Sequence, residues 1–230
     1  MNMKKPIHWL IGIDEAGRGP LAGPVAVGVV LVPADFDWRQ LPGVGDSKQL
    51  TEAKREEIYV NANDLQKTVK LSFAVGLVSA KVIDKIGIVP AVNLALKRAL
   101  DRVTKPAKVL PLQTKESLSL LRQDLREEVR IDWGQVLVQL DGGLRAPEYC
   151  MKQETIIKGD SKEKIIGLAS IMAKVTRDRY MKRIARQSQY LPYEFPRHKG
   201  YGTAVHRRAI AHYGYSVEHR QSYCKNIKIL

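Results

Sequence analysis

The chain has 230 residues, long enough to bury a full hydrophobic core, and 38 Lys and Arg against 24 Asp and Glu give it a formal charge of +14. The excess is concentrated in residues 151–230, where 17 Lys and Arg stand against 6 Asp and Glu, which predicts a polyanionic partner. Two cysteines exclude a disulfide framework, and no window approaches the ~20 apolar residues of a membrane span. We therefore expect a cytoplasmic protein without membrane contact, and a monomer.

The first predicted elements form a β-hairpin. Two apolar runs, Trp9–Ile13 and Val25–Val32, flank the sequence AGRGPLAGP, whose glycines and prolines are typical of a turn. Residues 69–78 form a third apolar run, so we expect a third strand there.

Helices and further strands follow. Residues 79–103 have a helical periodicity that is interrupted near Gly87 and Pro90, which predicts two helices, the second amphipathic. Residues 136–140 are typical of a short buried strand, and residues 155–157 indicate another. Because strands alternate with helices, the sequence predicts an α/β fold.

Two segments are predicted to stand apart. Residues 114–130 place apolar side chains at helical spacing with charges on the other face, which indicates an inserted amphipathic helix that either packs on the core or serves as a docking face. From residue 188 the chain is rich in His, Tyr, Arg and Pro. We interpret residues 188–230 as a C-terminal helical extension of a core formed by residues 1–187.

Two acids end the first predicted strand. Asp14 and Glu15 run directly into a glycine turn, and neighbouring side chains on a strand point to opposite faces. They share a ligand only if the strand ends or bends there, which Gly17 permits, while Gly19 lets a ligand approach the backbone closely. A plain hairpin turn is the alternative, but two acids followed by Arg18 favour a binding site.

A third acid ends a later strand. Asp141 follows the run VLVQL and precedes two glycines, so alone it is equally consistent with a turn. However, the ends of adjacent strands at one edge of an α/β sheet form the usual ligand site. We therefore predict that Asp141 is a co-ligand of Asp14.

A predicted helix supplies the fourth acid. Ile171, Val175 and Asp178 lie on one helix face, so the carboxylate points toward the core. A buried carboxylate is costly unless it pairs with a cation or binds a metal. A salt bridge to a neighbouring basic residue is the alternative, but the three other acids favour a metal.

Four converging carboxylates repel one another unless divalent cations neutralise them. Oxygen ligands favour Mg²⁺ or Mn²⁺ over zinc. Two such ions about 4 Å apart activate an attacking water and stabilise the leaving oxygen of an in-line displacement. The predicted reaction is hydrolysis of a phosphodiester.

These acids lie within an ordered set of motifs: GIDEAGRGPLAGPV, DSKQL, VQLDG, KGDSK, ASIMAKVTRDR and HKGYGT. From residue 11 to about residue 220 the chain resembles the bacterial ribonuclease HII family. The resemblance implies a ribonuclease H-like mixed β-sheet flanked by helices, and two Mn²⁺ or Mg²⁺ ions. It also implies a catalytic and metal-binding set of Asp14, Glu15, Asp141 and Asp178.

The resemblance further implies how the substrate is bound. Gly17, Arg18 and Gly19 are implied to read the ribose 2′-hydroxyl, mainly through backbone groups, and that hydroxyl distinguishes RNA from DNA. Tyr201 is implied to pack near the step from RNA to DNA. Substrate phosphates are implied to be held by Lys48, Ser170 and Lys174.

The implied partners are RNA/DNA hybrids and duplex DNA that contains ribonucleotides. The implied activity cuts the RNA strand, or the 5′ side of a single embedded ribonucleotide, and leaves 5′-phosphate and 3′-hydroxyl ends. Ribonucleotide excision repair and primer removal are the implied roles, and a replication-clamp contact has no residue to support it. Gly143, where the family commonly has Asn, and residues 161–168 depart from the family pattern, which leaves the local geometry near Asp141 open.

Three other functions fit parts of the pattern. A ribonuclease HIII-like specificity is disfavoured, since that family carries a further N-terminal domain and a Lys in place of Arg18. A weak or non-catalytic binder of hybrids agrees with the charge but not with the presence of four acids. An actin-like kinase needs a second similar domain, for which 230 residues are too few.

Overall fold

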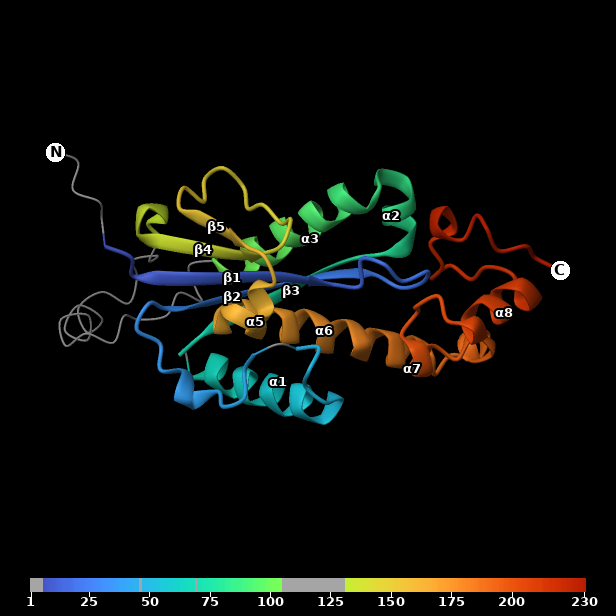
Figure 1. Cartoon of the computed structure of the whole chain (residues 1–230), viewed down its shortest axis with the longest axis horizontal. Coiled ribbons are helices and arrows are strands. Elements are labelled where there is room, and N and C mark those ends of the chain that lie inside the picture. The colour runs from blue at the N-terminus through green and yellow to red at the C-terminus, as the bar shows by residue number, and fades with distance from the viewer. Residues whose placement is uncertain (1–5, 46, 69, 105–130) are drawn as a thin grey trace.

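One mixed sheet of five strands forms the centre of the computed structural model, which describes residues 6–45, 47–68, 70–104 and 131–230. The strand order is β3-β2-β1-β4-β5 (Figure 1). The central strand β1 pairs antiparallel with β2 and parallel with β4, and β3 and β5 form the edges. The strands are β1 (Trp9–Ala16), β2 (Val25–Pro33), β3 (Ser72–Val78), β4 (Val136–Asp141) and β5 (Gln153–Ile156).

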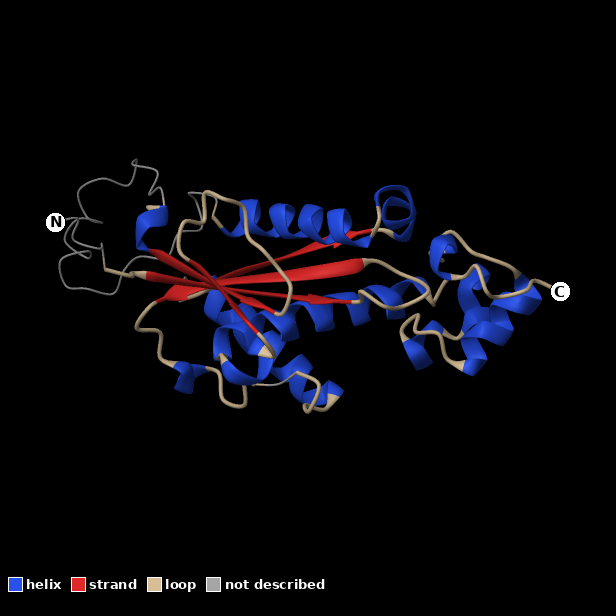
Figure 2. Cartoon of the chain, turned by 45° about the horizontal axis from the view of Figure 1, so that its top comes forward, coloured by secondary structure: helices blue, strands red, loops and turns tan. Residues whose placement is uncertain are grey.

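Helices cover both faces of the sheet (Figure 2). One apolar core lies between α3 and the sheet, and a second lies between the opposite face, α1 and α6. The helices are α1 (Glu52–Lys67), α2 (Ala80–Ile86), α3 (Ile88–Val103), α5 (Gly159–Lys162), α6 (Lys164–Ile184), α7 (Phe195–His198) and α8 (Ala204–Tyr213). Short 3₁₀ turns are η1 (Trp38–Gln40), η3 (Trp133–Gln135), η4 (Ser188–Tyr193) and η5 (Gln221–Tyr223).

Two glycines allow α6 to lie directly on the central strands. A Cβ atom added at Gly12 would lie 2.4 Å from the carbonyl oxygen of Ile165, and one added at Gly28 would lie 2.2 Å from that of Ala169. Any larger residue would separate helix and sheet. The close approach brings the polar side chains of α6 within reach of the end of β1.

The C-terminal elements pack around a third core. Tyr190, Tyr193 and Phe195 bury their rings against the end of α6 and against Leu21 of the β1–β2 connection. In Figure 1 these elements, coloured orange and red, lie beyond the hairpin end of β1 and β2. The chain from residue 188 is therefore helical and packed on the core, while a boundary at residue 187 stays a prediction.

The structure confirms the hairpin and the α/β architecture, with one correction. The helices of residues 79–103 are separated at Gly87, whose φ is +82°, whereas Pro90 lies in the first turn of α3, where its missing N–H costs no hydrogen bond. The predicted helix of residues 114–130 lies outside the described residues. Within the described ranges, no helix is both long and apolar enough to cross a membrane.

Candidate active site

Asp14 and Asp141 lie side by side at the ends of two parallel strands. The last register pair of β1 and β4 is Ile13 with Leu140, and both side chains belong to the core on the α3 side. Because side chains alternate along a strand, the next residue of each strand faces α6. The negative charge of Asp141 contributes to a raised pKa of Asp14, so the two carboxyls interact as the sequence predicted.

Asp14 is buried in a polar pocket. Its Oδ1 accepts a hydrogen bond of 2.7 Å from the Glu15 amide. The Ser170 hydroxyl also bonds the carboxyl and lies 2.8 Å from the Ser47 hydroxyl. Burial, with the charges of Asp141 and Glu15, raises the pKa of Asp14 to about 7 against the lowering effect of these hydrogen bonds. The hydrogen bonds from Ser170 and the Glu15 amide therefore do not fully compensate the cost of a negative charge on Asp14.

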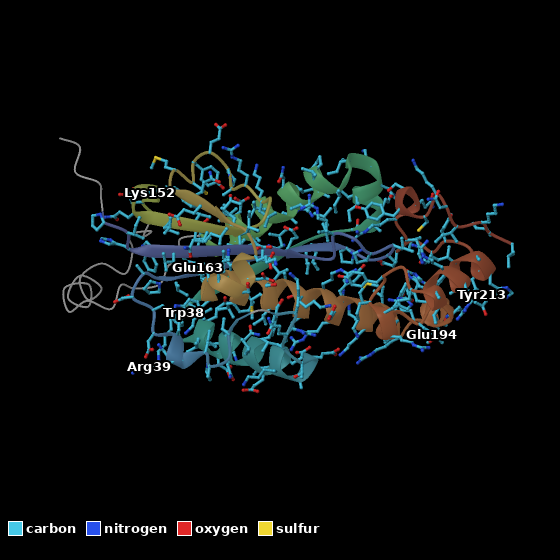
Figure 3. The ribbon with its side chains drawn as sticks, viewed as in Figure 1. Trp38, Arg39, Lys152, Glu163, Glu194 and Tyr213 are labelled. Atoms are coloured by element: carbon cyan, nitrogen blue, oxygen red, sulfur yellow. The ribbon has the colours of Figure 1, made fainter. Side chains whose placement is uncertain are left out.

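Asp160, which the sequence analysis did not single out, extends this cluster. It follows Gly159, whose amide donates a 2.7 Å hydrogen bond to Asp141 Oδ1. Its buried carboxylate lies 3.0 Å from Lys48 Nζ, and the charges of Asp14 and Asp141 also raise the pKa of Lys48. The sequence signal for Asp160 is the motif KGDSK. Periodicity could not identify Asp160 as buried, because a four-residue helix is too short to show a buried face. In Figure 3, Glu163 marks the junction of α5 and α6 just after this segment.

Glu15 occupies a different side of the strand from Asp14. β1 does not end at Asp14, because its pairing with β2 continues through Glu15 to Ala16. The Glu15 carboxylate bonds the Arg18 guanidinium at 3.1 Å. Its charge still contributes to the raised pKa of Asp14, although less than that of Asp141.

Asp178 is buried, as its position on α6 predicted. Both of its carboxylate oxygens lie 2.9 Å from the ammonium of Lys174, one turn earlier on the helix. Neither Asp178 nor Asp160 is among the charges that shift the pKa of Asp14, but Asp160 shares the ammonium of Lys48 with Asp14 and Asp141. The structure thus brings Asp178 and Lys174 together, and Ser170 and Lys48 to the acid cluster.

The donor set of the cluster fits a divalent cation. Among the described residues, no group of three or more His, Cys, Asp or Glu side chains is already arranged as a metal site. Nevertheless, carboxylate oxygens are the ligands that Mg²⁺ and Mn²⁺ prefer, and the charge of Asp141 contributes to the raised pKa of the buried Asp14. Asp14, Asp141 and Asp160 are the residues best placed to hold such an ion.

The predicted ribose-reading residues form the loop after β1. Gly17 has a φ of +83°, and a Cβ atom added there would lie 2.0 Å from Arg177 Nε, so only glycine fits. Arg18 and Gly19 are exposed. Tyr201 is 45% exposed, and its ring faces the guanidinium of Arg177 at 5.8 Å. The loop is joined to the Tyr201 segment because the Gly200 carbonyl accepts the amides of residues 21 and 22.

The mixed sheet, its flanking helices and the acids at adjacent strand ends define a protein of the ribonuclease H-like class. A family model described as "Ribonuclease HII" matches residues 11–226. Ribonuclease HII of Endomicrobium trichonymphae is 39% identical over 219 residues, which cover 95% of this chain and 87% of that protein. The chain belongs to the ribonuclease HII family, enzymes that cleave RNA/DNA hybrids, and the prediction made from the motifs is confirmed.

Solved structures agree with the fold. Ribonuclease H2 from Pyrococcus horikoshii OT3 superimposes with a TM-score of 0.63 at 24% identity, covering 96% of this chain and 97% of that one. Ribonuclease HII of Archaeoglobus fulgidus, solved in complex with PCNA, superimposes with a TM-score of 0.57 at 25% identity. The match covers 88% of this chain and 85% of that one.

Proposed function

We propose that this enzyme cuts the RNA strand of RNA/DNA hybrids and the 5′ side of single ribonucleotides embedded in duplex DNA, leaving 5′-phosphate and 3′-hydroxyl ends. The observation that carries the proposal is the placement of Asp14, Asp141 and Asp160 around Lys48, facing α6. Beside this cluster lies the exposed loop of Arg18 and Gly19. The motifs from residue 11 to about residue 220 supply the substrate class.

Each part of the site has a distinct proposed role. The chemistry supplied by two bound Mg²⁺ or Mn²⁺ ions is activation of water and stabilisation of the leaving oxygen. Asp14 and Asp141 would bind these ions, and the charge of Glu15 would add to the attraction. The Ser170 hydroxyl orients the carboxyl of Asp14. Lys48 bonds Asp160 at 3.0 Å and its side chain is 79% exposed, so we assign it a contact with a substrate phosphate.

The ribose side of the site lies at the junction with the C-terminal elements. We assign recognition of the 2′-hydroxyl to the backbone of residues 17–19, and stacking at the RNA-to-DNA step to the exposed ring of Tyr201. Lys174 is assigned a second phosphate contact. The net charge of +14 supplies the non-specific part of binding to nucleic acid.

The fourth acid of the proposed set is better supported at Asp160 than at Asp178. Asp160 lies against the Lys48 ammonium, whose pKa also responds to Asp14 and Asp141. Asp178 instead pairs with Lys174. We keep both as candidates, since one pair of variants separates them.

The decisive variant is Asp14→Asn. We expect it to abolish cleavage of a duplex with one embedded ribonucleotide, because the amide is a poorer ligand and carries no charge for a cation. Binding of the same duplex is expected to stay within about threefold, since most affinity comes from phosphate contacts. A gel-based cleavage assay and fluorescence anisotropy measure the two effects. Robust cleavage by the variant contradicts the proposed site.

Metal dependence is tested on the wild-type enzyme. Cleavage is expected in Mg²⁺ or Mn²⁺ and not in EDTA, with the cut mapped to the 5′ side of the ribonucleotide. A cut that persists in EDTA, or one within an all-deoxy duplex, contradicts the proposal. A weak or non-catalytic hybrid binder is the second candidate, and it predicts binding without any cleavage.

The proposed cellular role is ribonucleotide excision repair, with primer removal as a second role. Both follow from the proposed cut at a ribonucleotide. The Archaeoglobus fulgidus relative was solved with PCNA, and a clamp contact of this chain is a prediction that a binding assay with a clamp protein checks.

A further inference from the structure

A buried arginine from the C-terminal end of the chain holds the loop that follows β1. Arg220 is fully buried, and its guanidinium donates four hydrogen bonds to backbone carbonyls. Nη2 bonds Gly17 O at 2.7 Å, Nη1 bonds Arg18 O at 2.9 Å, and Nε and Nη2 bond Gly23 O at 3.0 and 2.9 Å. One planar fork thus fixes both ends of the connection between β1 and β2.

The same loop leaves its amides free. Across the described residues, Gly17 N, Arg18 N and Gly19 N donate no hydrogen bond to protein. The carbonyls of Gly17 and Arg18 point inward to the Arg220 guanidinium. The residues Arg18 and Gly19 are themselves exposed. No atom lies within 4 Å of the position of a Cβ atom at Gly19. The loop therefore offers fixed backbone donors to a ligand in open space.

The position of Arg220 is itself fixed. Its amide donates to Leu21 O at 2.8 Å. Asp84 of α2 accepts the amides of Gln221 and Ser222 at 2.8 and 3.1 Å, and the Ser222 hydroxyl as well. The arginine therefore reaches the loop from a segment that is itself anchored on α2.

Arg220 has no carboxylate partner in the described part of the chain, although a buried charge is normally paired. Arg177, equally buried, repeats this arrangement with the carbonyls of Ala22 and Pro24. Burial lowers the pKa of both guanidiniums, although nearby charges oppose this effect, so two such cations behind one loop are costly to bury. Their shared effect is to hold loop carbonyls in place.

We propose that Arg220 is a positioning residue for ribose discrimination: by holding the carbonyls of Gly17, Arg18 and Gly23, it aligns the loop amides that read the 2′-hydroxyl. This inference rests on the proposed function, because it assumes that the loop contacts the ribose. The hydrogen bonds of the Arg220 guanidinium in the described structure go to these carbonyls and not to the acids. Its loss is expected to reduce the preference for a ribonucleotide rather than overall binding.

The test compares two duplexes of one sequence, one with a single ribonucleotide and one all-deoxy. Their Kd values are measured by fluorescence anisotropy in Mg²⁺, with every variant in the Asp14→Asn background so that the duplex stays intact. The preference for the ribonucleotide is the Kd of the all-deoxy duplex divided by the Kd of the ribonucleotide duplex. For Arg220→Gln we expect this ratio to fall by about tenfold or more, with the Kd of the all-deoxy duplex unchanged within about twofold. For Arg220→Lys, a partial fall is expected, since an ammonium lacks the planar fork.

A matched control is Arg207→Gln. Arg207 also donates to a backbone carbonyl, that of Gly202, in the C-terminal elements, but it is exposed and does not contact the loop of residues 17–19. Its ratio is expected to equal that of the parent. Asp84→Ala, which frees the Arg220 segment from α2 without altering the arginine, is expected to give an intermediate ratio.

The outcomes separate the two proposals. A parent protein that binds both duplexes equally contradicts the proposed function. If the parent prefers the ribonucleotide and folded Arg220→Lys and Asp84→Ala both keep its full ratio, the positioning role is overturned. Equal weakening of both duplexes by Arg220→Gln also overturns it, because that result indicates a purely structural role. Thermal unfolding verifies folding, and Arg220→Lys and Asp84→Ala decide if Arg220→Gln does not fold.

Discussion

At the scale of single residues, the site is an electrostatic arrangement that is only partly balanced. Asp14 is only 5% exposed to solvent. Its pKa is raised to about 7, because burial and the neighbouring carboxylates oppose its ionisation. Its hydrogen bonds from Ser170 and the Glu15 amide recover only part of that cost. A bound divalent cation would complete the balance, which is the physical reason to propose one beside this carboxyl.

The fourth acid is identified by comparing Asp160→Asn with Asp178→Asn. We expect Asp160→Asn to slow cleavage by on the order of 100-fold, because it removes a charge beside Lys48 within the cluster. Asp178→Asn is expected to slow it by less than about tenfold, since its partner Lys174 lies on the same helix. Single-turnover cleavage rates measure both. If Asp178→Asn slows cleavage more than Asp160→Asn does, Asp178 is the fourth acid of the site, as the sequence predicts.

Sequence patterns identified some of these residues and not others, for physical reasons. Asp14 and Asp141 follow apolar strands, and Asp178 follows a helical period, so each is visible as an acid at a defined place. Asp160 lies in a four-residue helix without a period. The contact of Arg220 with Gly17 spans 203 positions in the sequence, and no local pattern encodes such a distance.

At the scale of elements, the close contact between α6 and the sheet positions Ser170 at Asp14. The hairpin was predictable because its Gly- and Pro-rich connection separates two apolar runs. The parallel pairing of β1 with β4 joins strands that are more than 120 residues apart, and periodicity alone does not specify it. The family resemblance, rather than the spacing of apolar residues, supplied that part of the fold.

Gly28→Ala tests this helix-to-sheet contact. The added methyl group would lie 2.2 Å from the carbonyl oxygen of Ala169, so the helix must shift. Overpacking of this kind costs about 1–3 kcal/mol of unfolding free energy. Urea unfolding at equilibrium measures it. Gly143→Ala is the control, because nothing lies within 4 Å of its added Cβ atom, and equal stabilities of the two variants contradict the role of Gly28.

At the scale of the whole molecule, the candidate site joins parts that are remote in the sequence. The core supplies the acids through β1, β4 and α5, and the C-terminal elements supply Tyr201 and Arg220. The Tyr201 segment is held in turn by histidines. His206 Nδ1 donates to Tyr201 O at 2.9 Å, and its Nε2 lies 3.0 Å from Nε2 of His219. The proposed recognition of substrate therefore requires the C-terminal elements to be folded.

These histidines make the stability of the C-terminal elements depend on pH. A carbonyl only accepts hydrogen bonds, so His206 carries its proton on Nδ1 and its Nε2 accepts from His219, whose Nδ1 accepts the Ser216 amide at 2.9 Å. Both rings are therefore neutral. Burial lowers the pKa of each ring to about 4, from 6.5 in the unfolded chain.

Between these two pKa values the unfolded chain binds more protons than the folded one. The histidine contribution to stability is therefore fully present above about pH 6.5 and is lost as the pH falls toward 4. We expect the wild-type protein to lose on the order of a few kcal/mol more than His206→Gln between pH 7 and pH 4.5, measured by urea unfolding. Comparing the two proteins removes the shared effect of the carboxylates. The exposed His212, changed to Gln, is expected to leave the wild-type pH dependence unaltered, and an equal loss in wild type and His206→Gln contradicts a neutral buried pair.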